Sequence, residues 1–264
     1  MRASWLPALA LLAAPAPALS PFLVKDINTV PFAQGSSPRG YAEAGGLAFF
    51  AADDGESGLE LWRSDGTAAG TFQVADACPG DCSSRPVVVA RAGGSVFFQA
   101  FGRGFGPVDL WVTDGSPAGT VRLAGPFLRP DSGRSLWIAG QGVLYFAAND
   151  LVHGMELWRS DGTPAGTYQV ADLRPGAGGS EPAELTEAGG RLFFTADDGA
   201  HGPALWTSDG TAGGTELVAD PLPGSATHRG PSLLRAAGRK LFFVAPVSRR
   251  RDALWASDGT AGGT

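Results

Sequence analysis

The sequence predicts an all-β fold, a β-propeller of about five four-stranded blades, and three observations support this. The pair Leu-Trp recurs at nearly constant spacing, so the chain contains five copies of one unit of about 48 residues. Each copy holds short apolar segments bounded by Gly, Pro, Asp or Ser, which is typical of strands. The 39 Gly and 20 Pro among 264 residues are typical of short strands joined by many turns. The tryptophans that mark the copies are Trp62, Trp111, Trp158, Trp206 and Trp255.

The second segment of each copy indicates how the strands pack. Neighbouring side chains on a strand point to opposite faces of the sheet, so two adjacent aromatic residues place one ring on each side. Both faces must then be buried, as they are when sheets pack face to face around an axis. We therefore expect one propeller domain over residues 19–264. The pairs are Phe49-Phe50, Phe97-Phe98, Phe193-Phe194 and Phe242-Phe243.

An Asp-Gly pair follows the tryptophan segment in every copy, and we interpret it as a structural turn between the third and fourth strands. Asp-Gly favours turns that need a positive φ, and the carboxylate can accept backbone N–H bonds within the turn. A calcium site would need several oxygen ligands in one loop, whereas each turn supplies a single carboxylate. We therefore predict no metal there. The pairs are Asp65 and Gly66, Asp114 and Gly115, Asp161 and Gly162, Asp209 and Gly210, and Asp258 and Gly259.

The N-terminal part of the predicted domain is in phase with the repeat. Residues 22–26, with the sequence FLVKD, resemble FQVAD at residues 72–76, and the fifth copy stops at Thr264, where its fourth strand should begin. We expect the N-terminal strand to complete the fifth blade beside Trp255, which would remove exposed sheet edges and leave a monomer. The alternative is a truncated copy of a longer array.

The first residues indicate export. Arg2 is followed by an apolar run at residues 5–14 and an A-x-A cleavage pattern at residues 16–18, so residues 1–18 are predicted to be a signal peptide. The run is too short to span a bilayer well, and no other stretch predicts a membrane span. We expect a secreted protein, extracellular or periplasmic. In that environment Cys78 and Cys82 are expected to form a disulfide.

The net charge limits the classes of molecule that the protein is expected to bind. The net charge is −6, and no basic stripe is present, which argues against nucleic acid as a partner. The expected partner is an unknown extracellular protein or a glycan.

One motif resembles a known family. The sequence ELWRSDGT at residues 60–67, repeated at residues 156–163, resembles the bacterial ELWxxDGT repeat family. That resemblance implies an exported, repeat-built protein and no defined activity. Asp109, Ala204 and Ala253 replace the first Glu in the other copies, which indicates that this carboxylate is not a strict requirement of the blade.

The candidate binding residues lie in the loops between the second and third strands, because the sequences of these loops vary between copies. Turn chemistry alone would explain the acidic pairs, and the alternative is a polar rim that binds a glycan or a cation. Two histidines at matching positions supply two ligands at most for a zinc ion. The candidate residues are Asp53, Asp54, Asn149, Asp150, His153, Asp197, Asp198 and His201.

These observations predict an exported, non-catalytic interaction or structural module, with no catalytic residue and no cofactor. One alternative is a lectin-like propeller, for which Phe101 and Phe105 are the candidate aromatic residues. The other is a glycoside-active enzyme using Glu43 and Glu187, which occupy matching positions on innermost strands.

Overall fold

The computed structural model describes residues 21–31, 35–103, 106–127, 137–140, 142–223, 229–248 and 250–264. The predicted signal peptide and Phe105 lie outside these residues. The described part contains 19 strands, one short 3₁₀ helix at Ala261–Gly263 and no α-helix. No helix in these ranges is long and apolar enough to cross a bilayer. The predicted all-β class is confirmed.

The strands form five antiparallel sheets, which we number in chain order. The first contains β1 (Arg39–Ala44), β2 (Leu47–Asp53), β3 (Leu59–Ser64) and β4 (Phe72–Ala75). The second contains β5 (Val87–Ala92), β6 (Ser95–Phe101), β7 (Val108–Thr113) and β8 (Val121–Phe127). The third contains β9 (Trp137–Gly140), β10 (Val143–Asn149), β11 (Met155–Ser160) and β12 (Tyr168–Ala171). The fourth contains β13 (Ala183–Ala188), β14 (Arg191–Asp197), β15 (Pro203–Ser208) and β16 (Glu216–Ala219). The fifth contains β17 (Ser232–Ala237), β18 (Lys240–Ser248) and β19 (Arg251–Ser257).

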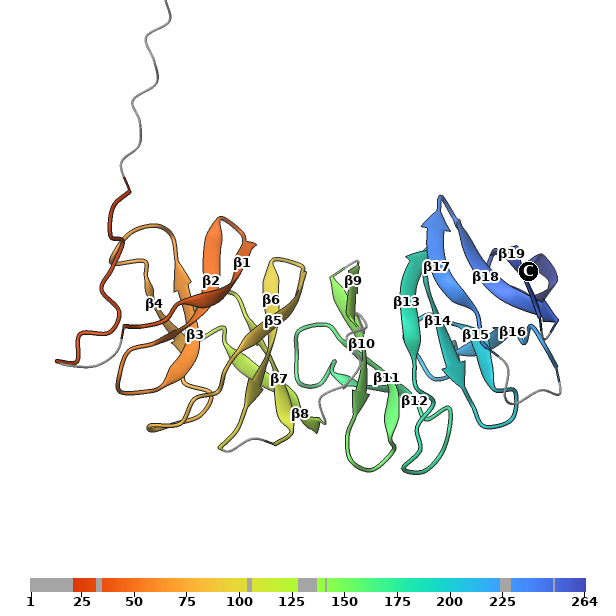
Figure 1. Cartoon of the computed structure of the whole chain (residues 1–264), viewed down its shortest axis with the longest axis horizontal. Coiled ribbons are helices and arrows are strands. Elements are labelled where there is room, and N and C mark those ends of the chain that lie inside the picture. Colours follow the sequence, from red (N-terminus) through yellow and green to blue (C-terminus); the bar gives the residue numbers. More distant parts are fainter. Residues whose placement is uncertain are drawn as a thin grey trace, which may run out of the picture.

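The five sheets stand side by side in chain order, and the first and fifth lie at opposite ends of the longest dimension (Figure 1). The first strand of each sheet contacts the first strand of the next, from β1 through β5, β9 and β13 to β17. The sheets therefore share one inner side, while their fourth strands lie farther out.

Apolar side chains fill the space between successive sheets. Phe49 faces the second sheet while Phe50 lies on the other face of β2, and both are buried. Four apolar clusters each join two neighbouring sheets, from the first and second to the fourth and fifth. Burying a Phe side chain contributes roughly 1.5–3 kcal/mol, so these paired rings are major contributors to the packing of one sheet on the next. The packing on both faces agrees with the sequence prediction.

The prediction that an N-terminal strand completes the fifth sheet is wrong for this structure. The fifth sheet has three strands, and residues 22–26 form no strand. They lie against the first sheet, where Lys25 Nζ donates to the Thr71 carbonyl at 2.7 Å and lies 5.9 Å from the centre of the Trp62 ring. Ile27 packs on Phe50. The physical reason is that, among the described residues, no other sheet packs on this apolar face of the first sheet, so the segment covers it.

The predicted disulfide is present. Cys78 and Cys82 are bonded in the connection between β4 and β5, with their Cα atoms 5.4 Å apart. This separation lies within the usual range for a disulfide.

Candidate functional site

Three loops leave the same edge of the first, third and fourth sheets, because these sheets share one strand order. We call this the loop edge; it comprises residues 54–58 between β2 and β3, residues 150–154 between β10 and β11, and residues 198–202 between β14 and β15. Each loop begins with the second member of a pair of acidic or amide side chains, and the first member ends the preceding strand. The sequence analysis named both members as candidate binding residues.

In the first loop these side chains hold the loop together. Asp53 Oδ1 accepts a hydrogen bond from the Gly55 N–H at 2.7 Å. Asp54 Oδ1 accepts from the N–H groups of Glu56 and Ser57 and from the Ser57 hydroxyl, at 2.8–2.9 Å. Burial of the Asp54 carboxylate favours a higher pKa. The hydrogen bonds from the backbone N–H groups of Ser57 and Glu56 outweigh it, so the pKa of Asp54 is lowered. The carboxylate oxygen that makes these bonds therefore has an internal, structural role.

The other two loops repeat this arrangement. Asn149 accepts from the Leu151 N–H and Asp197 from the Gly199 N–H, both at 2.8 Å. Asp150 and Asp198 each accept two backbone N–H bonds within their own loop. The three loops consequently have closely similar, internally bonded shapes.

His153 and His201 extend these networks rather than meeting each other. His153 Nδ1 lies 2.7 Å from Asp150 Oδ2, and His201 Nδ1 lies 2.7 Å from Asp198 Oδ2. The hydrogen bond to each aspartate raises the pKa of its histidine. Within the described ranges no three His, Cys, Asp or Glu side chains are grouped so as to hold a metal ion.

One residue of the loop edge departs from its counterparts. Leu151 has a φ of 72°, where the matching positions are Gly55 at 87° and Gly199 at 82°. A side chain in this left-handed region costs about 1–2 kcal/mol, which glycine avoids. The side chain of Leu151 is 51% exposed and that of its neighbour Val152 is 65% exposed. The strained position therefore places an apolar side chain on the outside of the loop.

A buried carboxylate that sequence reasoning underestimated lies beneath the loop edge. Glu60 in β3 is fully buried. Its oxygens accept from the Ser84 N–H at 2.8 Å, the Ser84 hydroxyl at 2.6 Å and the Ala77 N–H at 3.0 Å. Burial raises the pKa of Glu60, although these three donors oppose that shift. These contacts of Glu60 with Ala77 and Ser84, which we call the clamp, tie the first sheet to the connection that leads to the second.

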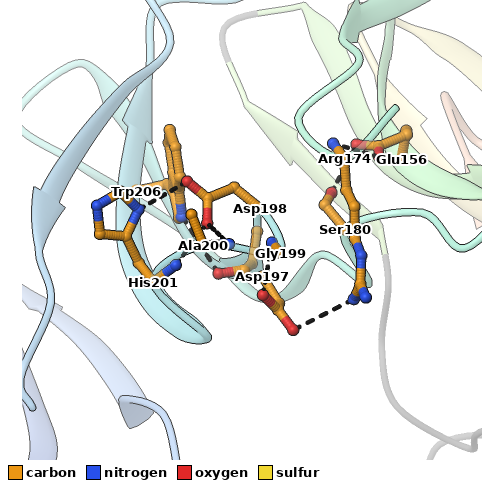
Figure 2. A network of polar contacts seen from close by, with 10 residues as sticks. Glu156, Arg174, Ser180, Asp197, Asp198, Gly199, Ala200, His201 and Trp206 are labelled. Atoms are coloured by element: carbon orange, nitrogen blue, oxygen red, sulfur yellow. Dashed lines mark hydrogen bonds and ion pairs between the residues drawn. The ribbon is translucent and has the colours of Figure 1, made fainter. Parts of the chain in front are cut away.

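The same clamp recurs between the third and fourth sheets (Figure 2). Glu156 in β11 accepts from the Ser180 hydroxyl at 2.5 Å and from the N–H groups of Leu173 and Arg174. The Ser180 carbonyl in turn accepts from the Asp197 N–H at 2.8 Å, and Arg174 Nη1 lies 3.3 Å from Asp197 Oδ2. The network thus runs from a buried carboxylate of one sheet to the loop edge of the next.

A spacing in the sequence could have revealed the clamp. Glu60 precedes Ser84, and Glu156 precedes Ser180, by 24 residues in both cases. In the fourth sheet Ala204 replaces the glutamate, and Arg229 stands where the serine would be, two residues before Pro231 as Ser84 and Ser180 are before Pro86 and Pro182. The two partners are therefore absent together at that junction.

The Asp-Gly pairs lie between the third and fourth strands, at the edge opposite the loop edge. Asp65 Oδ1 accepts from the Thr67 N–H at 2.9 Å and from its hydroxyl at 2.7 Å. The Gly66 N–H donates to the Ser64 hydroxyl, and a Cβ at Gly70 would collide with the Asp65 carboxylate. Both glycines are therefore needed, the first for its φ of 88° and the second for space. The aspartate bonds recur in all five copies.

The residues considered for catalysis and sugar binding are not brought together. Glu43 lies on β1 and Glu187 on β13, with the second and third sheets between them. The side chain of Glu43 is largely exposed and lies 3.7 Å from Arg91 of the next sheet. Phe101 is partly buried against the cluster between the second and third sheets. Glu43 and Glu187 thus do not form a pair of flanking carboxylates, and Phe101 is not an exposed aromatic platform.

Comparisons with known proteins concern the fold. No family model matches this chain, and no curated protein matches it. Dipeptidyl peptidase 4 from Porphyromonas gingivalis is 10% identical with a TM-score of 0.49, over 84% of this chain and 37% of that one. A puromycin hydrolase is 16% identical with a TM-score of 0.45, over 83% and 36%. TolB from Acinetobacter baumannii is 14% identical with a TM-score of 0.36, over 81% and 50%. The chain spans between about a third and a half of the length of these structures, and likenesses at this level assign it no activity.

Proposed function

We propose that the protein is an exported, non-catalytic repeat module, built as successive blades of a propeller, that binds an extracellular protein through its loop edge. The contact centres on residues 150–154. The observation that carries the proposal is the strained, exposed conformation of Leu151, because strain at an exposed loop is retained where it serves binding or a switch.

The internal bonds of the loops support this proposal. Asp150 and Asn149 fix the backbone of the loop that carries Leu151 and Val152. A loop that is already ordered loses little conformational entropy on binding, so its contacts contribute more fully to affinity. Exposed aliphatic side chains fit an apolar protein surface better than a sugar, which prefers aromatic faces and polar donors.

The test uses Leu151→Gly, which separates the structural role of this residue from a binding role. Glycine relieves the φ of 72°, so the free energy of unfolding should stay unchanged or rise by up to about 1 kcal/mol. Binding of an extracellular protein, captured from the secreted fraction and then purified, should weaken by about tenfold or more. The measurements are denaturant unfolding and surface plasmon resonance.

Val121→Ser is the matched control, because Val121 is an exposed aliphatic residue on β8, away from the loop edge. It should leave partner binding unchanged. Equal loss of binding in both variants would contradict the proposal. Selective binding on a glycan array would favour the lectin alternative, and polysaccharide hydrolysis lost on Glu43→Gln or Glu187→Gln would favour the enzyme alternative.

A further inference from the structure

The outer face of the fifth sheet is apolar and uncovered. Leu254 on β19 is 74% exposed, whereas its counterparts in the four earlier sheets are at most 2% exposed because the next sheet packs on them. Phe242 on β18 lies on the same face and is partly exposed, whereas its counterpart Phe193 is fully buried. We call this the tail face, comprising Phe242, Val244, Leu254 and Ala256. The buried counterparts of Leu254 are Leu61, Leu110, Leu157 and Leu205.

The first sheet has the complementary face, which in later sheets packs on the sheet before it. Residues 24–27 cover only part of this head face, and a cavity of about 520 Å³ remains. The cavity is lined by Ile27, Tyr41, Leu47, Phe50, Asp65 and Gly66, among others. Tyr41 is 68% exposed. The lining is mainly apolar, which suits an apolar side chain.

The Asp-Gly turns show what normally occupies this position. Space beside Gly115 and Gly259 is taken by Phe49 and Phe193 of the preceding sheet, so a Cβ would contact those rings. At Gly66 a Cβ would meet nothing within 4 Å. The counterpart of these rings on the tail face is Phe242. The cavity at the head therefore lacks the kind of side chain that the tail exposes.

The N-terminal segment already occupies the place of an outer strand. Ile27 packs against Phe50 and Trp62 of the first sheet. Leu173, which follows β12, packs against the apolar cluster that includes Phe194 and Trp206 of the fourth sheet. Residues 22–27 thus lie where the last strand of a preceding sheet would lead into the first sheet. The fifth sheet, conversely, consists of three strands with an open edge at β19.

We propose that a second copy of this chain covers the head face, with its tail face packed into the cavity. In this head-to-tail contact Phe242 of one copy lies against Gly66 of the next, and Leu254 is covered. The edge of β19 pairs with residues 22–26 of the other copy, which completes a four-stranded sheet between the two molecules. Unpaired strand edges commonly bind extended segments in this way.

The proposed interface repeats the apolar packing of the four junctions between sheets inside the chain. Because its two faces differ, the contact is heterologous and builds rings or open chains of copies. A ring closed within one chain would leave a monomer, as expected from the sequence. The structure instead places the first and fifth sheets, which carry the two faces, at opposite ends of the longest dimension (Figure 1).

Two variants that each block one face test the proposal. Leu254→Asp charges the tail face, and Tyr41→Asp charges the head face; both positions are exposed, so the fold should be retained. In sedimentation equilibrium the unmodified protein should increase in mass with concentration. Each variant alone should remain a monomer. An equimolar mixture should form a one-to-one dimer and nothing larger, because only one competent junction is left.

Val121→Asp is the control, since Val121 is an exposed aliphatic residue on β8 that belongs to neither face, and it should associate like the unmodified protein. A single mass at every concentration for the unmodified protein would overturn the proposal. Self-association of either blocked variant would also overturn it, because a contact between two identical faces would then be responsible.

A variant that should strengthen the association tests how the two copies are aligned at the proposed interface. The Ser36 carbonyl accepts from the Asp53 N–H, as the Ser84 and Ser180 carbonyls accept from their own sheets, so Ser36 is placed as a clamp serine. Its partner on the tail would be position 253, which is alanine. Ala253→Glu should tighten association by about tenfold, since a buried charge-assisted hydrogen bond is worth at least 1.4 kcal/mol. Adding Ser36→Ala should cancel this gain. No tightening by Ala253→Glu would overturn the proposed register.

Discussion

Glu60 and Glu156 each tie a sheet to the connection that leads to the next one. Each carboxylate is fully buried and accepts three hydrogen bonds, so it satisfies backbone N–H groups that would otherwise be unpaired. An unsatisfied buried donor costs about 1–3 kcal/mol, which makes this carboxylate important for the junction. The desolvation of the charge opposes that gain, as the raised pKa of both residues shows.

We expect Glu60→Gln to lower the free energy of unfolding by about 1–3 kcal/mol, because an amide presents one acceptor oxygen where a carboxylate presents two. The pKa of Glu60 is raised above its ordinary value of 4.5. The contribution of this raised pKa to the free energy of unfolding is therefore fully present below the pKa that Glu60 has in the unfolded chain. It declines as the pH rises through the pKa that Glu60 has in the folded protein. The cost of the substitution should then be larger at about pH 4 than at about pH 8. Urea unfolding at both pH values measures it.

Glu43→Gln is the control for this measurement, because the Glu43 side chain is largely exposed. It should change the free energy of unfolding by no more than about 0.5 kcal/mol at either pH. A cost of Glu60→Gln that rises with pH would contradict the assigned shift.

The clamp could be predicted from the sequence only in part. The repetition of Glu in the ELW motif was visible, but its partner lies 24 residues away in a connection with little regularity. Because two copies have alanine in place of this glutamate, at positions 204 and 253, the sequence indicated that the carboxylate is not required. The structure shows that the fourth junction lacks both partners, so loss of one is matched by loss of the other. Paired residues of this kind are recognised only once the contact is known.

At the scale of single elements, the turn between the third and fourth strands was predictable. Its Asp-Gly pair has a known preference for this conformation, and the structure places Asp209 and Gly210 between β15 and β16 as expected. The role of the second glycine was not predictable, because it depends on how closely the backbone approaches the aspartate. At Gly214 a Cβ would collide with the Asp209 carboxylate, while at Gly213 it would meet nothing within 4 Å.

These two adjacent glycines offer a matched pair of substitutions. Gly214→Ala should lower the free energy of unfolding by about 1–3 kcal/mol, since the turn must open to accommodate the methyl group. Gly213→Ala should be neutral or stabilising by up to about 1 kcal/mol, since alanine restricts the unfolded chain. Thermal and urea unfolding of both variants measure the difference. Equal effects would show that the collision at Gly214 is relieved without cost.

At the scale of the whole molecule, the sequence predicted the number and packing of the sheets but not how the array ends. The phase of the repeat identified residues 22–26 as the equivalent of a fourth strand. Phase does not say which sheet such a segment joins, because the same sequence can pair with β19 or cover the first sheet. In this structure Lys25 and Ile27 bind the first sheet. The candidate rim residues were correctly grouped by loop, but their internal bonding could not be inferred from spacing.

The position of a leucine in the array of sheets decides how much its side chain contributes to the free energy of unfolding. Leu205→Ala, within the array, should lower the free energy of unfolding by about 2–5 kcal/mol, because Leu205 is fully buried between the fourth and fifth sheets. Leu254→Ala, at the equivalent place on the fifth sheet, should change it by no more than about 0.5 kcal/mol at dilute concentration. Unfolding at low micromolar protein measures both. A comparable cost at position 254 would mean that this side chain is covered within one molecule.

The missing clamp at the fourth junction has a mechanical consequence. Glu184 Oε2 accepts from the Leu234 N–H at 3.3 Å, which ties β13 to β17 on the inner side, while Ala204 and Arg229 cannot form the contact that Glu60 makes with Ser84. The fifth sheet is thus not held by the glutamate contact that ties the first sheet to the second and the third to the fourth. We expect it to rotate about β17 more readily than the sheets at those two junctions move relative to each other.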